Sequence, residues 1–229
     1  SFTAMIAYSQ KGAQQYINAG FSSENVYVAM NATASAPKGP PPLRPIWDHE
    51  YIPVLLYVGR LQARKKLDVL IAACSQLPEK IQPNLWIVGE GPIKNDLVNL
   101  ARKVYPRTQF WGEKFGDDLS RIFLKADLFV LPGTGGLAVQ QAMAHALPVI
   151  VAEGDGTQSD LVSTSSGWNI KPDDQRELID TIKSALEDPM VLRQKGLNAY
   201  QTVQLKVNIE QMVAVFKQAC FETLSRVKP

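Results

Sequence analysis

The chain has 229 residues, 45% of them hydrophobic and 20% charged, which is typical of a globular protein with a sizeable core. Its formal net charge of +2 is too close to neutrality for a protein that binds nucleic acid by charge alone, so we expect no nucleic-acid partner. No apolar run is long enough to span a membrane, and the first residues do not form a signal peptide. Because the chain begins without methionine, we expect a trimmed sequence.

The first thirty residues carry one strand-helix-strand pattern. The sequences AMIAYS and NVYVAM predict strands on either side of the helix predicted by KGAQQYINAG. The segment SAPKGPPPLRP (35–45) follows, and its prolines predict a stiff, extended linker. We therefore expect one unit over 1–34 and a linker over 35–50.

From Tyr51 onward, short apolar runs alternate with amphipathic stretches. Strands are predicted at 54–59, 85–89, 108–112, 127–132, 147–152 and 167–172. Helices are predicted at 66–77, 93–105, 117–126 and 174–188, and another after Gly136. Continuous apolar strands that alternate with helices indicate parallel pairing with right-handed crossovers. The sequence therefore predicts an α/β fold with a doubly wound parallel sheet over 51–200. A long helix at 208–227 lies in the final segment, 201–229.

Glycine follows almost every predicted strand. The sequences after the first five are GRLQARKK, GEGP, GEKFGD, PGTGGL and EGDGTQSD. The carboxyl ends of parallel strands share one edge of the sheet, where ligands bind in open α/β folds. Glycine allows close approach of backbone to ligand, and a helix N-terminus offers free N–H groups. Arg60, Arg64, Lys65 and Lys66 add positive charge that suits phosphate. We therefore predict a diphosphate site at this edge.

Two cysteines, Cys74 and Cys220, lie far apart in segments of helical pattern. Such an arrangement favours two buried free thiols over a disulfide or a metal site, and it fits a reducing compartment. The sequence contains no Asp-x-Asp, and His49 and His145 are its only histidines. We therefore expect no metal and no other cofactor.

The ordered set of segments resembles retaining glycosyltransferases with the GT-B fold, of the group 1 or family 4 type. The segments that carry the likeness are LLYVGRLQARKKLDVLIAA, LWIVGEGP, FWGE, LSRIFLKADLFVLP and GLAVQQAMAHALPVIVAEGDG. The likeness is to the nucleotide-sugar-binding carboxyl-terminal domain and covers about 51–190. Segment 1–34 resembles the end of the amino-terminal, acceptor-binding domain, and the last helix resembles the segment that crosses back to it.

This resemblance implies transfer of a sugar from a nucleotide-sugar, such as a UDP or GDP sugar, with retention of anomeric configuration. The acceptor, a glycan or a lipid, would bind the amino-terminal domain, most of which this chain lacks. We therefore expect the chain to bind the donor without transferring the sugar. The implied location is cytoplasmic, with peripheral contact at the inner face of the membrane as a candidate feature of the full-length protein.

The resemblance also implies site residues. Arg60 and Lys65 occupy the places of an arginine and a lysine that the family presents to the donor diphosphate, and Lys66 stands where glycine is usual. Both cations would stabilise the charge that develops on the departing diphosphate, in place of a divalent metal. Phe115 is a candidate to stack on the base. The expected donor-binding set is Gly59, Gly89, Phe115, Gly133, Thr134, Gly135, Gly136, Leu137 and Gln141.

Two glutamates of the family motif, eight positions apart, are replaced by Gly133 and Gln141. Gln141 can still hydrogen-bond the ribose, whereas Gly133 offers the donor sugar no side chain. Asp160 stands where the family often has a glutamate. The glycines can also be read as a tight turn, the basic cluster as a solvated face, and Gln141 as a surface residue. The alternative function is a non-catalytic donor- or partner-binding protein. Nucleotide-sugar 2-epimerases share the fold, but their acidic and histidine groups have no match here.

Overall fold

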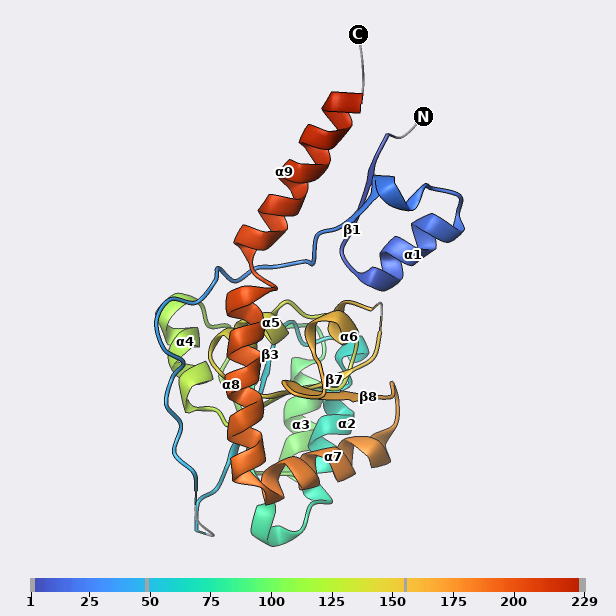
Figure 1. Ribbon diagram of the computed structural model, residues 1–229. Coiled ribbons are helices and arrows are strands. Elements are labelled where there is room, and N and C mark those ends of the chain that lie inside the picture. Colours follow the sequence, from blue (N-terminus) through green and yellow to red (C-terminus); the bar gives the residue numbers. More distant parts are fainter. Residues whose placement is uncertain (1–2, 48–49, 155, 227–229) are drawn as a thin grey trace.

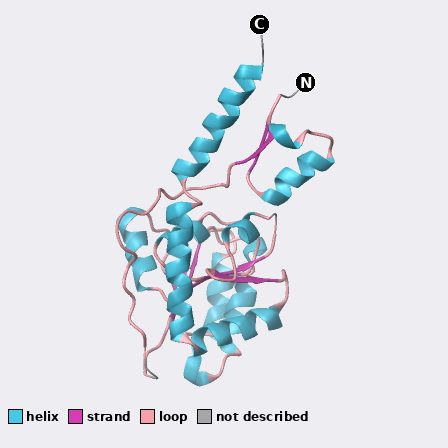
Figure 2. Ribbon diagram, viewed as in Figure 1, coloured by secondary structure: helices cyan, strands magenta, loops and turns pink. Residues whose placement is uncertain are grey.

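A computed structural model describes residues 3–47, 50–154 and 156–226. A six-stranded parallel sheet forms the centre of the larger unit, and helices cover both of its faces (Figures 1 and 2). Its strands are β3 (Val54–Val58), β4 (Asn84–Val88), β5 (Thr108–Phe110), β6 (Leu128–Leu131), β7 (Val149–Ala152) and β8 (Gly167–Ile170). The order β5-β4-β3-β6-β7-β8 reverses between β3 and β6, as in doubly wound folds. The predicted fold class is confirmed.

The helices lie in two layers. Helices α2 (Leu67–Ser75), α3 (Lys94–Val104) and α7 (Gln175–Glu187) pack together on one side, and α5 (Ala138–Ala144) packs on α8 (Pro189–Leu205) on the other. The remaining helices of this unit are α4 (Gly116–Lys125) and the short α6 (Thr157–Leu161). Helices α6 and α8 were not predicted, although α8 begins with a clear signal: Asp188 caps the Val191 N–H at 3.0 Å, and Pro189 is the first residue of the helix.

The end of the chain forms two helices rather than one. Helix α9 (Ile209–Arg226) matches the helix predicted at 208–227, but the first residues of segment 201–229 complete α8. Asn208 separates the two helices. Its Nδ2 donates to the carbonyl of Val203 at 2.8 Å, and its Oδ1 accepts from Gln211 N–H at 2.8 Å. One side chain thus satisfies the last turn of α8 and caps α9.

The first residues form a small unit beside α9. Strands β1 (Met5–Ala7) and β2 (Val26–Val28) pair in parallel, with α1 (Gln10–Asn18) between them in sequence. Tyr27 donates from its hydroxyl to Glu222 Oε2 at 2.6 Å, which fastens β2 to α9. The two ends of the described chain therefore lie side by side (Figure 1).

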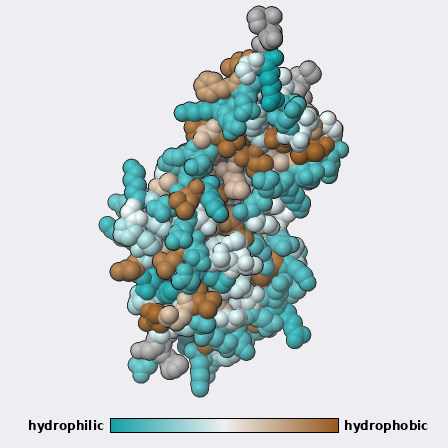
Figure 3. All heavy atoms as spheres, viewed as in Figure 1, coloured by the Kyte–Doolittle hydropathy of each residue, from teal (hydrophilic) through white to brown (hydrophobic). Residues whose placement is uncertain are grey.

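Helix α9 is mostly exposed. Ala219 is its only buried residue among those described, and Phe221 and Leu224 are 72% and 69% exposed. Apolar side chains accordingly show on the surface formed by α9 and the N-terminal unit (Figure 3). The prediction of two buried thiols is therefore wrong for Cys220, which is exposed on this helix, whereas Cys74 is buried in α2. A helical pattern does not reveal whether another element covers the helix.

The proline-rich linker is fastened to the larger unit by two arginines. Arg193 donates from Nε to the carbonyl of Pro45 at 2.9 Å, and its guanidinium lies 4.5 Å from the ring centre of Trp47. Arg44 is surrounded by helix-end carbonyls. Its guanidinium donates to the carbonyls of Phe123 at 2.8 Å, Leu124 at 3.0 Å, His145 at 2.8 Å, and Ala126. Burial, with Arg193 nearby, lowers the pKa of Arg44 to about 10.

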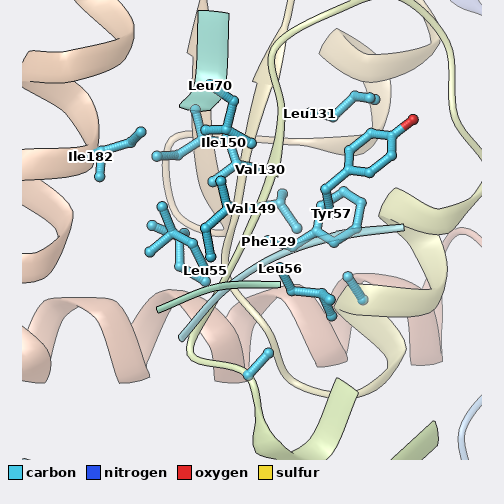
Figure 4. Packing of buried hydrophobic residues seen from close by; sticks show 14 of the residues in the cluster. Leu55, Leu56, Tyr57, Leu70, Phe129, Val130, Leu131, Val149, Ile150 and Ile182 are labelled. Carbon is cyan, nitrogen blue, oxygen red and sulfur yellow. The ribbon is translucent and has the colours of Figure 1, made fainter. Parts of the chain in front are cut away.

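The central strands are buried on both faces. Leu55, Leu56, Tyr57, Phe129 and Ile150 have no solvent exposure and lie in one apolar cluster (Figure 4). Tyr57 reaches from this core to the sheet edge, where its hydroxyl donates to the carbonyl of Arg60 at 3.1 Å. The core thus holds the loop after β3 in place.

Candidate functional site

The loops that follow β3, β4 and β5 are joined backbone to backbone. The Gly59 N–H donates to the carbonyl of Val88 at 3.0 Å, and the Gly89 N–H donates to the carbonyl of Gly112 at 2.8 Å. Gly89 has a φ of +132°, and a Cβ there would lie 2.0 Å from the Gly59 carbonyl oxygen. Only glycine fits at this position, because a side chain would force the two loops apart.

A cavity of about 620 Å³ lies at this edge of the sheet. It brings together five of the residues predicted to bind donor: Gly59, Arg60, Gly89, Phe115 and Gln141. The cavity is also lined by three residues that were not predicted from the sequence: Glu90, Glu113 and Lys114. These residues directly follow predicted strands, in the segments GEGP and GEKFGD. Their position after those strands is the feature of the sequence that could have indicated their place in the cavity.

Three side chains of the cavity are placed to contact one ligand. Arg60 is exposed, and its guanidinium has no partner among the described residues. Phe115 precedes the first residue of α4 and is 74% exposed, so its ring is open to stacking. Gln141 lies half-buried on α5. A cation, an aromatic ring and an amide can bind phosphate, base and hydroxyl groups, respectively.

The loop between β6 and α5 lies directly on the 3-10 turn Ala63–Lys65. Thr134 N–H donates to the carbonyl of Arg64 at 3.2 Å. A Cβ added at Gly133 would lie 2.1 Å from that same oxygen and 2.6 Å from Lys65 Cα. Gly133 therefore allows a backbone contact that no other residue would permit.

Lys65 is tied to this loop. It is 5% exposed, and its Nζ donates to the carbonyls of Thr134 at 2.7 Å and Gly135. Burial, followed by the charge of Arg64, lowers the pKa of Lys65 to about 8. An ammonium has three donors, so one remains for a ligand. The next residue, Lys66, has a φ of +55°, which explains why glycine is usual there in the family that the sequence resembles.

A second cavity, of about 290 Å³, lies between the N-terminal unit and the larger unit. Gly135, Gly136 and Leu137 line it, together with Tyr8, Ser9, Asn31, Thr157 and Gln158. The predicted donor-binding residues are therefore not all in one place: Gly59, Gly89, Phe115 and Gln141 line the larger cavity, Gly135, Gly136 and Leu137 line the smaller one, and Gly133 and Thr134 line neither.

The two adjacent glutamines of α5 lie in different environments. Gln141 lines the larger cavity, whereas Gln140 is 1% exposed and mainly bonded to backbone. The Oε1 of Gln140 accepts from the N–H groups of Thr33 at 2.6 Å and Ala34 at 2.9 Å. Its Nε2 donates to the carbonyl of Val207 at 2.6 Å. Gln140 thus joins the end of the 1–34 segment to the α8–α9 junction, a role that the sequence did not predict.

Two further candidates have structural contacts. Asp160 Oδ2 accepts from Gln10 N–H at 2.6 Å and so caps α1. His145 stacks on Phe123 with ring centres 5.0 Å apart, and burial lowers its pKa. His49 lies outside the described residues, as does Asp155, the first aspartate of the segment EGDGTQSD and a second carboxylate at this edge of the sheet in the sequence. Within the described ranges, no three His, Cys, Asp or Glu side chains are grouped as metal ligands. Nor does any helix in those ranges have the length and apolar character to cross a membrane.

Comparisons with known proteins agree with this arrangement. The model of the family described as "Glycosyl transferases group 1" matches residues 46–202. A sulfoquinovosyl transferase of Arabidopsis thaliana is 30% identical over 142 residues, which cover 59% of this chain and 27% of that protein. A glycogen synthase of Mycobacterium tuberculosis is 31% identical over 154 residues, covering 64% and 37%. The chain thus spans about a quarter to two fifths of these relatives.

Solved structures show the same fold. The Anabaena protein Alr3699/HepE in complex with UDP has a TM-score of 0.75 at 21% identity, with 98% of this chain and 64% of that chain covered. Sucrose-phosphate synthase from Thermosynechococcus elongatus has a TM-score of 0.76 at 24% identity, covering 96% and 58%. Such neighbours confirm the predicted GT-B fold class.

Proposed function

Because the chain belongs to the glycosyl transferases group 1 family, we propose that it is the donor-binding part of a retaining glycosyltransferase that uses a nucleotide-sugar. The observation that carries this proposal is the cavity lined by Arg60, Phe115 and Gln141. The neighbour Alr3699/HepE has been solved with UDP and with UDP-glucose, which supports a donor of that chemical class. The acceptor, a glycan or lipid, would bind a part of the protein outside this chain.

In the proposed reaction, the bond between the anomeric carbon and the diphosphate oxygen breaks, and the diphosphate leaves with the electron pair. An acceptor hydroxyl forms the new bond on the same face of the sugar, and its proton goes to the departing diphosphate oxygen. Arg60 stabilises the charge on the leaving group, and the remaining N–H donor of Lys65 adds to this. Lys65 also holds the loop that begins α5.

A second candidate function is donor or partner binding without catalysis. The specific observation in its favour is Gly133, which stands in place of a motif glutamate. The backbone of Arg64 and Lys65 occupies the position where the first side-chain carbon of any other residue would lie. The group that faces the donor sugar in the family is therefore absent, and no room remains for it in this loop.

Nucleoside diphosphates are expected to bind this chain far more tightly than the matching nucleosides, because cationic side chains act on the phosphates. Arg60→Ala should weaken diphosphate binding by about 1.5–3 kcal/mol, the range for hydrogen bonds to charged groups. Isothermal titration calorimetry with UDP, GDP and their nucleosides measures both effects. Arg102→Ala, at an exposed position on α3, is the matched control. Equal affinity for nucleoside and diphosphate would disprove the phosphate site.

Gln141→Ala is expected to weaken nucleotide binding by about 0.5–1.5 kcal/mol, because the amide would lose its hydrogen bond to the ribose. Gln141→Glu should preserve or strengthen binding, since a carboxylate is a better acceptor. The same titrations with 2′,3′-dideoxynucleotides should show no effect of either change. Gln194→Ala on α8 serves as the control. Unchanged affinity of Gln141→Ala for the ribonucleotide would show that the motif position has no binding role.

Donor binding is expected to be independent of Mg²⁺ and Mn²⁺, because Arg60 and Lys65 supply the positive charge that a metal would. Titration of UDP with and without a chelator tests this expectation. A large loss of affinity on chelation would indicate a carboxylate site that this proposal omits, with Asp155 and Asp160 the first residues to substitute.

A further inference from the structure

The positive charge of the chain is concentrated at one edge of the sheet. Residues 102–125, which include β5 and α4, hold six of the 24 basic residues and three of the 22 acidic residues. The rest of the chain holds 18 basic and 19 acidic residues. This segment therefore has a net charge of +3, whereas the remainder has −1. Among the described strands, β5 lies at the edge of the sheet and pairs with β4 alone.

Within this segment, basic side chains surround a pair of indole rings. A hollow of about 260 Å³ is lined by Trp86, Trp111, Lys114, Asp118, Arg121, Ile122 and Lys125. The ring centres of Trp86 and Trp111 lie 5.1 Å apart, and Trp111 is 39% exposed. Asp118, Arg121, Ile122 and Lys125 have the spacing of one helix face. We refer to the residues that line this hollow as the basic tryptophan surface.

The cations of this surface are largely uncompensated. Lys114 and Lys125 have no ion-pair partner among the described residues. Arg121 lies 3.5 Å from Asp118, but their side chains are 73% and 69% exposed, so this pair is weak. An exposed indole flanked by lysine and arginine is the combination found where proteins meet the interface of a membrane.

We propose that the basic tryptophan surface docks on the headgroups of anionic phospholipids. The phosphates would pair with Lys114, Arg121 and Lys125, the hollow would receive a headgroup, and Trp111 would enter the interface. Lys114 also lines the donor cavity, so a membrane bound here would lie beside that cavity. The proposal does not depend on donor binding, which is measured separately.

Co-sedimentation with vesicles tests the proposal. The chain should bind phosphatidylcholine vesicles that contain phosphatidylglycerol, and it should bind pure phosphatidylcholine vesicles weakly. Arg121→Gln with Lys125→Gln should lower binding about thirtyfold, since each cation near an anionic surface contributes about fivefold. Trp111→Ala should lower binding about tenfold. High salt should abolish the contribution of the cations.

The matched control is Arg176→Gln with Lys183→Gln on α7, which removes the same charge from another part of the larger unit. Thermal unfolding of every variant shows whether it is folded, and UDP titration of the same variants separates this proposal from the proposed function. Equal binding to both kinds of vesicle, or an equal loss in the control, would overturn the proposal. Binding of heparin without binding of anionic vesicles would also overturn it, because the surface would then be a polyanion site.

Discussion

Asp127→Ala is expected to lower the free energy of unfolding by about 3–5 kcal/mol, the cost of leaving a buried charge without its partner. Asp127 is 2% exposed, and it lies between three donors. Its Oδ1 accepts from Arg193 at 2.7 Å, and its Oδ2 accepts from the Val54 N–H at 2.8 Å and the Tyr51 hydroxyl at 3.0 Å. The Arg193 side chain is itself only 10% exposed. Removing the carboxylate would therefore leave the Arg193 guanidinium without its anionic partner and weaken the attachment of the end of the linker.

Urea denaturation measures this effect. The control is Asp118→Ala, which removes a carboxylate from a mostly exposed ion pair and should change stability by less than about 1 kcal/mol. The Asp127→Ala/Arg193→Met double variant should recover much of the loss, since neither charge then remains unpaired. A loss of less than about 1 kcal/mol in Asp127→Ala would show that the linker does not depend on this ion pair.

Gly133→Ala is expected to lower stability by about 1–3 kcal/mol and to weaken nucleoside diphosphate binding about tenfold or more. The φ of Gly133 is not positive, so the backbone conformation would accept alanine. The limit is space, because the new Cβ would meet the backbone of Arg64 and Lys65. The loop would have to move away from Lys65, and the start of α5 would move with it.

Thermal unfolding and calorimetry with UDP measure the two effects. Gly154→Ala is the control, since its Cβ would make an ordinary 3.4 Å contact with Gln158 Oε1. Gly133→Glu restores the family's residue type, but the same collision should make it at least as damaging. A stable Gly133→Glu protein with improved donor binding would show that the loop opens easily, and it would remove the argument for a non-catalytic protein.

Local pattern was enough to predict the sheet and the edge that carries the site. The inner strands β3, β6 and β7 are continuous apolar runs because both of their faces are buried, and this is visible in single segments such as VLLYV. Parallel strands end at the same edge, so the residues after the strands were expected to meet. Gly59, Arg60, Gly89, Phe115 and Gln141 do line one cavity, even though they come from four separate loops and helices.

Only the tertiary structure revealed that residues which are adjacent and alike in sequence have different roles. Gln140 and Gln141 are adjacent and identical, but Gln140 contacts Thr33 and Val207, which lie 107 and 67 positions away. Lys65 is buried because the loop after β6 crosses it, and Gly133 is required because that loop comes within contact of Arg64. These roles depend on which distant segments pack together, and long-range packing leaves no periodic trace in the sequence around either partner.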